Sequence, residues 1–570
     1  MARIIIAFVM LLVTGALQPA FATTKSTGPC ARPAAGSEVL PPPDLFSSNG
    51  ELNVSLNYYT AVSDAGITLF CFQTPDGTES PTLNVNPGDT INITLTNMVP
   101  NPPGAPAEIV SNDKNKCGAK IMTPSSTNIH FHGLNTSPRC HSDEVIHTLV
   151  NSGQTFNYKI KIPKNEPPGL YWYHPHIHGV SSPAVQGGAS GAIIIEGIEN
   201  IQPAVAGLPQ RLLVLRDQPL RTVITQTSTA PFWDISANYV PITYPDFVPA
   251  IIKMQTGSKE FWRVANASAN TIMDLQLMYD GKPQALQVVG FDGVPTGSQD
   301  GKRRGTIITE KHLLIPPAGR AEFIVNAPDA SVKQAKLITN HIDSGPAGDY
   351  LPARTIAVIQ TTNKAPRLRK MPLPSAAPHK QRFEDLSDVK VTASRKLFFY
   401  EVYIESRQPP PGGNGYPPDN DKHMQFFITV DGQQNKVYDP ANPPAITTNK
   451  GAVEDWTIEN RTTEDHEFHM HQIHFLVTAI DGKPVPKNQR QFYDTYPVKY
   501  WDGVSETYPS ITVRMDFRGA VVGDFVYHCH ILDHEDGGMM AIIRVNPPGS
   551  KAEDGQVAQG GGSKQVHAAK

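Results

Sequence analysis

The segment GAVEDWTIEN at residues 451–460 recurs in two earlier versions, GDTINITLTN at 88–97 and GSKEFWRVAN at 257–266. In each version an Asn follows the Gly by nine residues, and large apolar residues stand five and seven positions after that Gly. A spacing of two is typical of a strand with one buried face, and the Gly marks the preceding turn. The paired apolar residues are Ile93 and Leu95, Trp262 and Val264, and Trp456 and Ile458. Three copies predict three related β-domains.

Length and composition agree with several small β-domains. The chain has 570 residues, of which 39% are hydrophobic, enough for several packed cores. Its 52 Pro and 44 Gly favour short strands and turns over long helices. The net charge of −4 excludes the basic surface of a nucleic-acid-binding protein. The absence of a charge excess or a Gly period excludes a disordered or collagen-like chain.

A second repeat relates the outer two domains. GLYWYHPH at 169–176 aligns with GDFVYHCH at 523–530, with His five and seven positions after the Gly in both. We therefore predict domains at 50–198, 205–362 and 395–548. A linker rich in Pro, Lys and Arg is expected at 363–394, and a disordered Gly-rich tail at 549–570.

The N-terminus has the layout of a secretory signal peptide. Met1-Ala2-Arg3 precedes an apolar run at 4–17, and Ala20-Phe21-Ala22 follows it. Because this run is short for crossing a bilayer, we predict a signal peptide at 1–22 rather than a membrane anchor. The mature chain is expected to be periplasmic or secreted, without a membrane span, and monomeric.

Five cysteines follow the predicted cleavage site: Cys30, Cys71, Cys117, Cys140 and Cys529. In an oxidising compartment four of them can form two disulfides in three ways. We favour Cys30–Cys71 with Cys117–Cys140. Cys529 is then left over, and its neighbours on both sides are histidines.

Most of the 19 histidines fall into four tight groups. On a strand, residues i and i+2 share a face about 6.6 Å apart, so two such imidazoles can reach different ions of one cluster. A single H-x-H is more often a pair of surface or core histidines. Four groups in domains that share a repeat indicate a metal cluster. The groups are HFH (130–132), HPHIH (174–178), HEFHMHQIH (466–474) and HCHILDH (528–534).

The ligand mix indicates copper. A structural zinc site closes with four ligands, often thiolates, so one Cys among about ten histidines excludes a zinc ribbon. His466, Cys529, His534 and Met539 supply two imidazoles, a thiolate and a thioether, the set of a blue-copper electron-transfer site. Met539 alone would more often be a core residue, but it follows His534 by five positions and Cys529 by ten.

These motifs resemble those of the three-domain multicopper oxidases, which include laccases and bacterial copper oxidases, over about residues 50–548. HFHG (130–133), YHPHIHG (173–179), HEFHMH (466–471) and HCHILDHEDGGMM (528–540) match the four copper motifs of that family in order. The resemblance implies an all-β fold of three consecutive cupredoxin-like Greek-key domains, each a β-barrel or sandwich. It also implies four copper ions per chain: one type 1, one type 2 and two type 3.

Carried over by position, the resemblance assigns every copper ligand. The type 1 ligands would be His466, Cys529, His534 and Met539. The type 2 ligands would be His130 and His469. The type 3 ligands would be His132, His174, His176, His471, His528 and His530. Acidic residues near these motifs serve proton delivery and water exit in the family, which makes candidates of Asp143, Glu535 and Asp536. The roles left for His178 and His474 are supporting or structural, and His141 and His147 have no assigned role.

The arrangement of the motifs has a physical reason. Cys529 faces away from His528 and His530, so one strand can touch both copper centres. Pro175 takes the place of Cys529 in the first domain, which therefore cannot hold a blue copper. The middle domain has no H-x-H and is expected to be structural, a spacer that completes the substrate side.

Two positions depart from the family pattern. Phe131 stands where Trp is common, which changes packing and removes no ligand. Glu467 stands where Pro is common. It adds a carboxylate beside a predicted type 1 ligand, and this carboxylate would alter the surface through which electrons enter.

The resemblance implies an oxidase that takes single electrons from a reductant and reduces dioxygen to water. The reductants in question are phenols and aromatic amines, or Cu(I) and Fe(II). Metal-oxidising relatives often carry a Met-rich insert, whereas the 13 methionines here are scattered, which favours phenols. A copper nitrite reductase, a cupredoxin electron carrier, or a copper store or cell-division protein with a degenerate fold would lack part of the ligand set.

Overall fold

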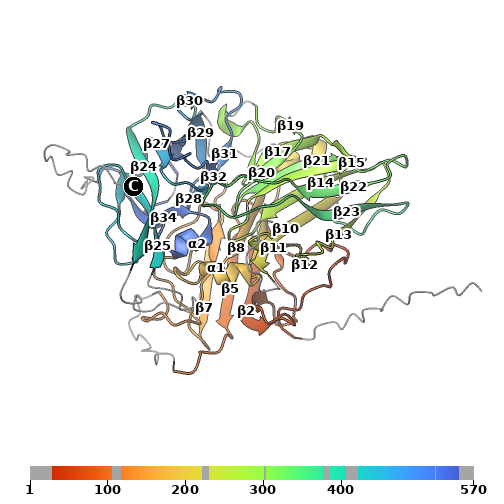
Figure 1. Cartoon of the computed structure of the whole chain (residues 1–570), viewed down its shortest axis with the longest axis horizontal. Helices are drawn as coiled ribbons and strands as arrows, with labels where there is room; N and C mark the ends of the chain where they lie inside the picture. Colours follow the sequence, from red (N-terminus) through yellow and green to blue (C-terminus); the bar gives the residue numbers. More distant parts are fainter. Residues whose placement is uncertain are drawn as a thin grey trace, which may run out of the picture.

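The computed structural model describes residues 28–104, 117–220, 230–300, 303–375, 385–405, 422–519 and 521–550 (Figure 1). Nearly all regular structure in these ranges is β, which confirms the predicted fold class. The short helices are α1 (Ser181–Gln186), α2 (Leu532–Asp536), η1 (Ile198–Asn200), η2 (Pro203–Val205) and η3 (Ser298–Asp300). The predicted signal peptide at 1–22, and the predicted tail beyond residue 550, lie outside the described residues.

Two sheets formed by the first nine strands make up what we call the N-terminal sheet pair. One sheet has the order β1 (Asp44–Phe46), β4 (Thr82–Val85), β9 (Gly191–Ile195), β8 (Gly169–His174), β6 (His130–His132). The other has the order β3 (Thr68–Gln73), β2 (Glu51–Val62), β5 (Thr90–Asn97), β7 (Thr155–Lys161).

The next strands form the middle sheet pair. One sheet has the order β12 (Val240–Ile242), β11 (Trp233–Ala237), β10 (Gln210–Pro219), β14 (Lys259–Asn266), β21 (Arg320–Asn326), β17 (Leu286–Phe291), β18 (Val294–Pro295), with β19 (Ile308–Glu310) on β17. The other has the order β13 (Ala250–Gln255), β23 (Arg354–Thr362), β22 (Ala335–Thr339), β15 (Met273–Tyr279), β16 (Lys282–Pro283), with β20 (Leu313–Ile315) on β15.

The last strands form the C-terminal sheet pair. One sheet has the order β25 (Lys422–Val430), β24 (Ala393–Glu405), β27 (Val453–Asn460), β33 (Ser510–Asp516), β29 (Phe475–Ile480), β30 (Lys483–Pro484), with β31 (Phe492–Tyr493) on β29. The other has the order β26 (Ile446–Asn449), β35 (Met540–Asn546), β34 (Gly523–Cys529), β28 (His466–Met470), β32 (Thr495–Val498). Figure 1 shows the three pairs grouped around β8, α1 and α2.

The three copies of the first repeat occupy equivalent places. They form β5, β14 and β27, each in the interior of its sheet. Each pairs parallel with one neighbour (β2, β10 or β24) and antiparallel with the other (β7, β21 or β33). All six of the predicted apolar residues are buried, so alternation along the strand places them in the core.

The Asn that ends each copy makes the same contacts three times. Asn97, Asn266 and Asn460 are each at most 1% exposed. Every side-chain amide donates to two backbone carbonyls, and every side-chain oxygen accepts from the backbone N–H two residues later. The Asn therefore ties the strand end to the loop that follows, which explains why this residue recurs.

A buried ion pair supports the same strand in the last two sheet pairs. Arg211 donates from Nε to Oε2 of Glu260 at 2.7 Å, and Trp262 donates from Nε1 to the same oxygen at 2.9 Å. Because the carboxylate is paired and hydrogen-bonded, its burial is tolerated. The same arrangement joins Arg395, Glu454 and Trp456.

Both favoured disulfides are present, and this prediction is confirmed. Cys30 is bonded to Cys71 and Cys117 to Cys140, whereas Cys529 is free and buried. Within the described ranges, no helix has the length and apolar character needed to cross a membrane.

Candidate metal centre

The strands of the second repeat bring the histidine motifs face to face. In the N-terminal sheet pair, β6 and β8 run antiparallel with His130 opposite His174. In the C-terminal pair, β28 and β34 run antiparallel with His469 opposite His528. All four rings are fully buried. The two strand pairs meet at the boundary between the outer sheet pairs.

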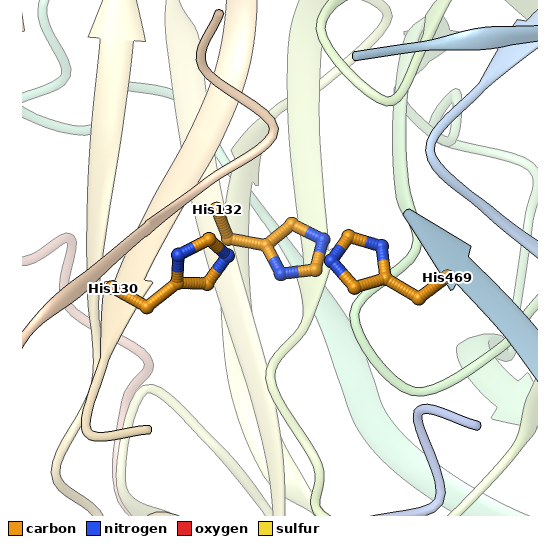
Figure 2. A group of neighbouring side chains, drawn as sticks. All are labelled: His130, His132 and His469. Atoms are coloured by element: carbon orange, nitrogen blue, oxygen red, sulfur yellow. The ribbon is translucent and has the colours of Figure 1, made fainter. Parts of the chain in front are cut away.

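Three groups of three imidazoles lie at this boundary, each with its nitrogens within 4.8 Å of one another. Figure 2 shows one of them, in which His469 of β28 approaches His130 and His132 of β6. Every group combines residues of both outer sheet pairs, so the cluster exists only where these pairs meet. The groups are His130 with His132 and His469, His132 with His174 and His530, and His176 with His471 and His528.

The chemistry of these rings fits bound metal ions. Nε2 of His130, His174 and His469, and Nδ1 of His132, are buried with no hydrogen-bond partner among the described residues. Burial lowers the pKa of His132, His174 and His469 well below the usual value, so these rings are neutral. Neutral imidazole is the form that binds metals, and a bound ion would relieve the cost of unpaired buried nitrogens. The residues therefore fit the copper cluster that the sequence predicts.

A fourth group contains the leftover cysteine. Nδ1 of His466 lies 3.1 Å from Nδ1 of His534, and Sγ of Cys529 lies 3.5 Å and 3.8 Å from these two nitrogens. A point equidistant from the three atoms lies about 2 Å from each, close to a metal–imidazole bond length. Burial raises the pKa of the Cys529 thiol well above its usual value, so a thiolate there needs a cation beside it.

The two adjacent methionines pack in different hydrophobic clusters. Met539 is fully buried in the same core cluster as Cys529, and its backbone bonds to Cys529 and to His534. Met540 packs in a separate cluster with Val526 and lines a cavity. Met539 is therefore the methionine that shares the core around the cysteine.

The three acidic candidates have different partners. Asp143 places Oδ1 3.0 Å from Nδ1 of His130, which leaves Nε2 of that ring for a metal. Glu535 is fully buried, with Oε2 3.1 Å from Nδ1 of His528 and Oε1 3.6 Å from Nε2 of His176. Asp536 instead accepts hydrogen bonds from the backbone N–H groups of Gly179 and Ser182, beside α1.

The middle sheet pair also reaches the cluster, through a residue that the sequence did not indicate. Arg320 on β21 forms two hydrogen bonds with the Asp494 carboxylate, whose Oδ1 lies 3.1 Å from Nε2 of His132. The backbone carbonyl of Asp494 lies 2.8 Å from Nδ1 of His469. His474 was expected in a supporting role, and its Nε2 lies 2.7 Å from the backbone carbonyl oxygen of Asp292. No motif marks Arg320 or Asp494, because their role depends on contacts between distant strands.

Glu467 is not on the surface where the sequence placed its effect. Its side chain is fully buried, and neither carboxylate oxygen has a hydrogen-bond partner among the described residues. Burial raises the pKa of this carboxyl well above its usual value. The expectation of an altered surface for electron uptake is therefore wrong, because the Glu467 side chain lies in the interior and not on the surface.

The fourth group reaches the surface at His534, whose side chain is 10% exposed. Nε2 of His534 lies 3.3 Å from Oε1 of Glu464, and the Phe426 ring stacks on the imidazole with centroids 4.5 Å apart. Glu401, Glu464 and His466 also bring their ligand atoms within 4.8 Å of one another. An electron donor would meet aromatic and acidic groups at this edge.

A cavity of about 820 Å³ lies against the cluster on another side. Its wall includes His176, together with His178 and Tyr438, whose ring centroids are 4.9 Å apart. Because His176 belongs to one of the imidazole groups, a small molecule in the cavity reaches the edge of the cluster.

Sequence comparison finds one family at both ends of the chain. Profiles described as "Multicopper oxidase" match residues 103–200 and 415–549. A "Multicopper oxidase mco" from Staphylococcus haemolyticus is 21% identical over 447 residues, which are 78% of this chain and 82% of that protein. A "Laccase" from Bacillus subtilis is 29% identical over 119 residues, which are 19% of this chain and 23% of that protein.

Solved structures share the fold over nearly the whole chain. The McoA multicopper oxidase 2F4 variant from Aquifex aeolicus superposes with a TM-score of 0.63 at 20% identity, over 90% of this chain and 100% of that one. A multicopper oxidase from Campylobacter jejuni, described as a metallo-oxidase, has a TM-score of 0.61 at 20% identity, over 90% of this chain and 96% of that one.

Proposed function

The chain belongs to the multicopper oxidase family, copper-binding oxidoreductases that use dioxygen as acceptor, and we propose that it oxidises phenols and aromatic amines with four bound copper ions. The single observation that supports this choice of electron donor is the surroundings of His534, a partly exposed imidazole that contacts an aromatic and an acidic side chain.

The proposed ligands follow the four geometric groups. His466, Cys529 and His534 would hold the type 1 ion, with Met539 as the axial ligand. His130 and His469 would hold the type 2 ion. The two remaining imidazole groups would hold the type 3 pair, with three rings for each ion: His132, His174 and His530, and His176, His471 and His528.

Copper would supply one-electron acceptance at the Cys529 group and dioxygen reduction at the imidazole cluster. The chain itself connects these two places. Cys529 lies between His528 and His530 in sequence, and its carbonyl oxygen lies 2.9 Å from Nδ1 of His528. The covalent bonds of Cys529, together with the hydrogen bond between its carbonyl oxygen and the His528 ring, therefore link the sulfur to the cluster. The cavity beside His176 offers dioxygen and water a route to the same rings.

At the donor edge, the side chains suit a phenol. Phe426 gives an aromatic face beside His534, and Glu464 offers an oxygen that can accept a hydrogen bond from the phenolic hydroxyl. The donor ring would then lie against His534, whose other nitrogen faces Cys529.

A second candidate donor is Fe(II), favoured by one observation. Glu401, Glu464 and His466 lie close enough to hold a cation together beside the type 1 group. Carboxylate oxygens with an imidazole suit Fe(II) better than Cu(I), which prefers sulfur ligands.

Export remains part of the proposal. Two disulfides agree with an oxidising compartment, as expected for a periplasmic or secreted protein.

Oxygen uptake by the copper-loaded protein tests these proposals, with 2,6-dimethoxyphenol, Fe(II) and Cu(I) in parallel. Burial and the neighbouring Glu401 raise the pKa of Glu464 to about 10, so Glu464→Gln should raise KM for the phenol about fivefold, the worth of one hydrogen bond to a neutral group. Because Glu401 adjoins Glu464, Glu401→Gln should raise KM for the phenol less than Glu464→Gln does, and Glu459→Gln, which alters a pair with Lys396, serves as the surface control. If oxygen uptake occurs with Fe(II) alone and is lost in Glu401→Gln, Fe(II) replaces phenols as the proposed electron donor. No uptake with any donor would contradict both proposals.

A further inference from the structure

The backbone of Glu467 is bonded to the sulfur of the free cysteine. Its N–H donates to Sγ of Cys529 at 3.4 Å, and its carbonyl oxygen accepts from the N–H of His530 at 2.8 Å. The register of β28 and β34, with Phe468 opposite Cys529, places Glu467 beside the sulfur.

The residue type at position 467 decides whether the first of these bonds can exist. Proline, which is common here in the family that the chain resembles, has no N–H to donate. We propose that Glu467 is a positioning residue whose backbone N–H, by bonding to Cys529, raises the reduction potential of the type 1 copper. This inference rests on the proposed assignment of Cys529, His466 and His534 to that ion.

The direction of the change in reduction potential follows from electrostatics. The reduced site carries one more negative charge than the oxidised site, and an N–H dipole that points its positive end at the sulfur stabilises the reduced site more. Hydrogen bonding around the Cys sulfur is a recognised control of blue-copper potentials. The effect is strengthened by the low dielectric of the interior, and both Glu467 and Cys529 are fully buried.

The side chain of Glu467 makes no hydrogen bond among the described residues, so side chain and backbone can be tested apart. Glu467→Pro removes the N–H. Glu467→Gln retains the N–H, has nearly the same shape and removes the acid, which makes it the matched control.

Redox titration of the copper-loaded protein, followed at the blue absorption band, measures the effect. Glu467→Pro should shift the one-electron equilibrium toward the oxidised form at least tenfold, which is a potential lower by about 59 mV. Its thiolate-to-copper absorption band should also move in energy. Glu467→Gln should shift the equilibrium much less. An unchanged potential in a blue Glu467→Pro protein, or an equal shift in Glu467→Gln, would overturn the inference.

A second substitution tests the inference if the Glu467→Pro protein fails to fold. Incorporating an α-hydroxy acid at position 467 turns the amide into an ester, which lacks the N–H and keeps the strand geometry. The ester protein should show the same lowered potential, and an unchanged potential would overturn the inference. A wild-type protein without any blue band would instead contradict the proposed function, so the two failures are distinguishable.

Discussion

Arg320 and Asp494 form a bidentate ion pair with no exposed surface, at 2.7 Å and 2.5 Å between nitrogen and oxygen atoms. The pair joins the middle and C-terminal sheet pairs, and the same carboxylate contacts His132 of the N-terminal pair. The approach is close: a Cβ on Gly133, whose φ is +86°, would lie 2.6 Å from Nη2 of Arg320. The middle sheet pair is therefore more than a spacer, because Arg320 positions Asp494, which contacts two imidazoles of the cluster, those of His132 and His469.

We expect Arg320→Gln to lower copper binding at the cluster and to leave the type 1 ion in place. Breaking one side of a buried pair costs about 3–5 kcal/mol and leaves Asp494 free to reorient His132. Metal analysis should show fewer than four copper ions per chain, with the blue absorption retained. Arg211→Gln breaks the buried pair with Glu260, away from the histidines, and is the matched control. Equal copper loss in both variants would contradict a specific role for Arg320.

Cys529→Ser should abolish the intense blue absorption and stop oxygen uptake. Serine offers no thiolate, so both the chromophore and the connection between the two sites are lost. Visible spectroscopy and oxygen consumption check this, and mass spectrometry of the non-reduced protein should show Cys529 free with two disulfides. A blue and active Cys529→Ser protein would contradict the assignment.

His130→Ala and His471→Ala should keep the blue absorption and lose oxygen reduction. Both rings belong to the imidazole groups, and neither belongs to the group of Cys529. Single-turnover reduction of the blue band by a phenol should therefore continue while steady-state oxygen uptake falls. Bleaching of the blue band with oxygen uptake preserved would reverse this partition of ligands.

Short-range spacing was enough to predict the local parts of this fold and site. The two-residue spacing of Trp456 and Ile458 predicts their shared buried face, and the H-x-H spacing of His528 and His530 predicts their shared approach to the cluster. Alternation along a strand is a local property, and each of these patterns lies within ten residues.

The remaining parts depend on contacts that no local pattern encodes. Arg320 meets Asp494, 174 positions later in the sequence, only after the sheet pairs dock. Glu467 looked like a surface carboxylate because charged residues are mostly exposed, yet its side chain is fully buried in the folded chain. The bond from its N–H to Cys529 requires the register of β28 and β34, which the sequence does not reveal.

The metal-free protein should lose stability as the pH falls below 6.5. Burial lowers the pKa of His528 and of His534 from 6.5 to about 3, so the unfolded chain binds more protons than the folded one in this interval. The contribution of these two histidines to the free energy of unfolding is present above pH 6.5. It is lost toward pH 3, at about 1.4 kcal/mol per pH unit for each histidine. Urea titrations at pH 7 and pH 5 check the metal-free protein. The copper-loaded protein is the control and should change less, because bound metal excludes the proton. If the metal-free protein had the same free energy of unfolding at both pH values, this would contradict the conclusion that its buried imidazoles are neutral.

Met539→Leu should raise the potential of the type 1 copper. A thioether is a weak axial ligand that stabilises oxidised copper more than reduced copper, so its loss favours reduction. Met539 shares the core of Cys529 and is bonded through its backbone to both Cys529 and His534, whereas Met540 faces the cavity beside His176. Met540→Leu is therefore the matched control, since it makes the same chemical change one residue away. Redox titration of the two copper-loaded variants should show a higher potential in Met539→Leu alone, together with oxidation of a wider range of phenols. A shift confined to Met540→Leu would move the axial assignment by one residue.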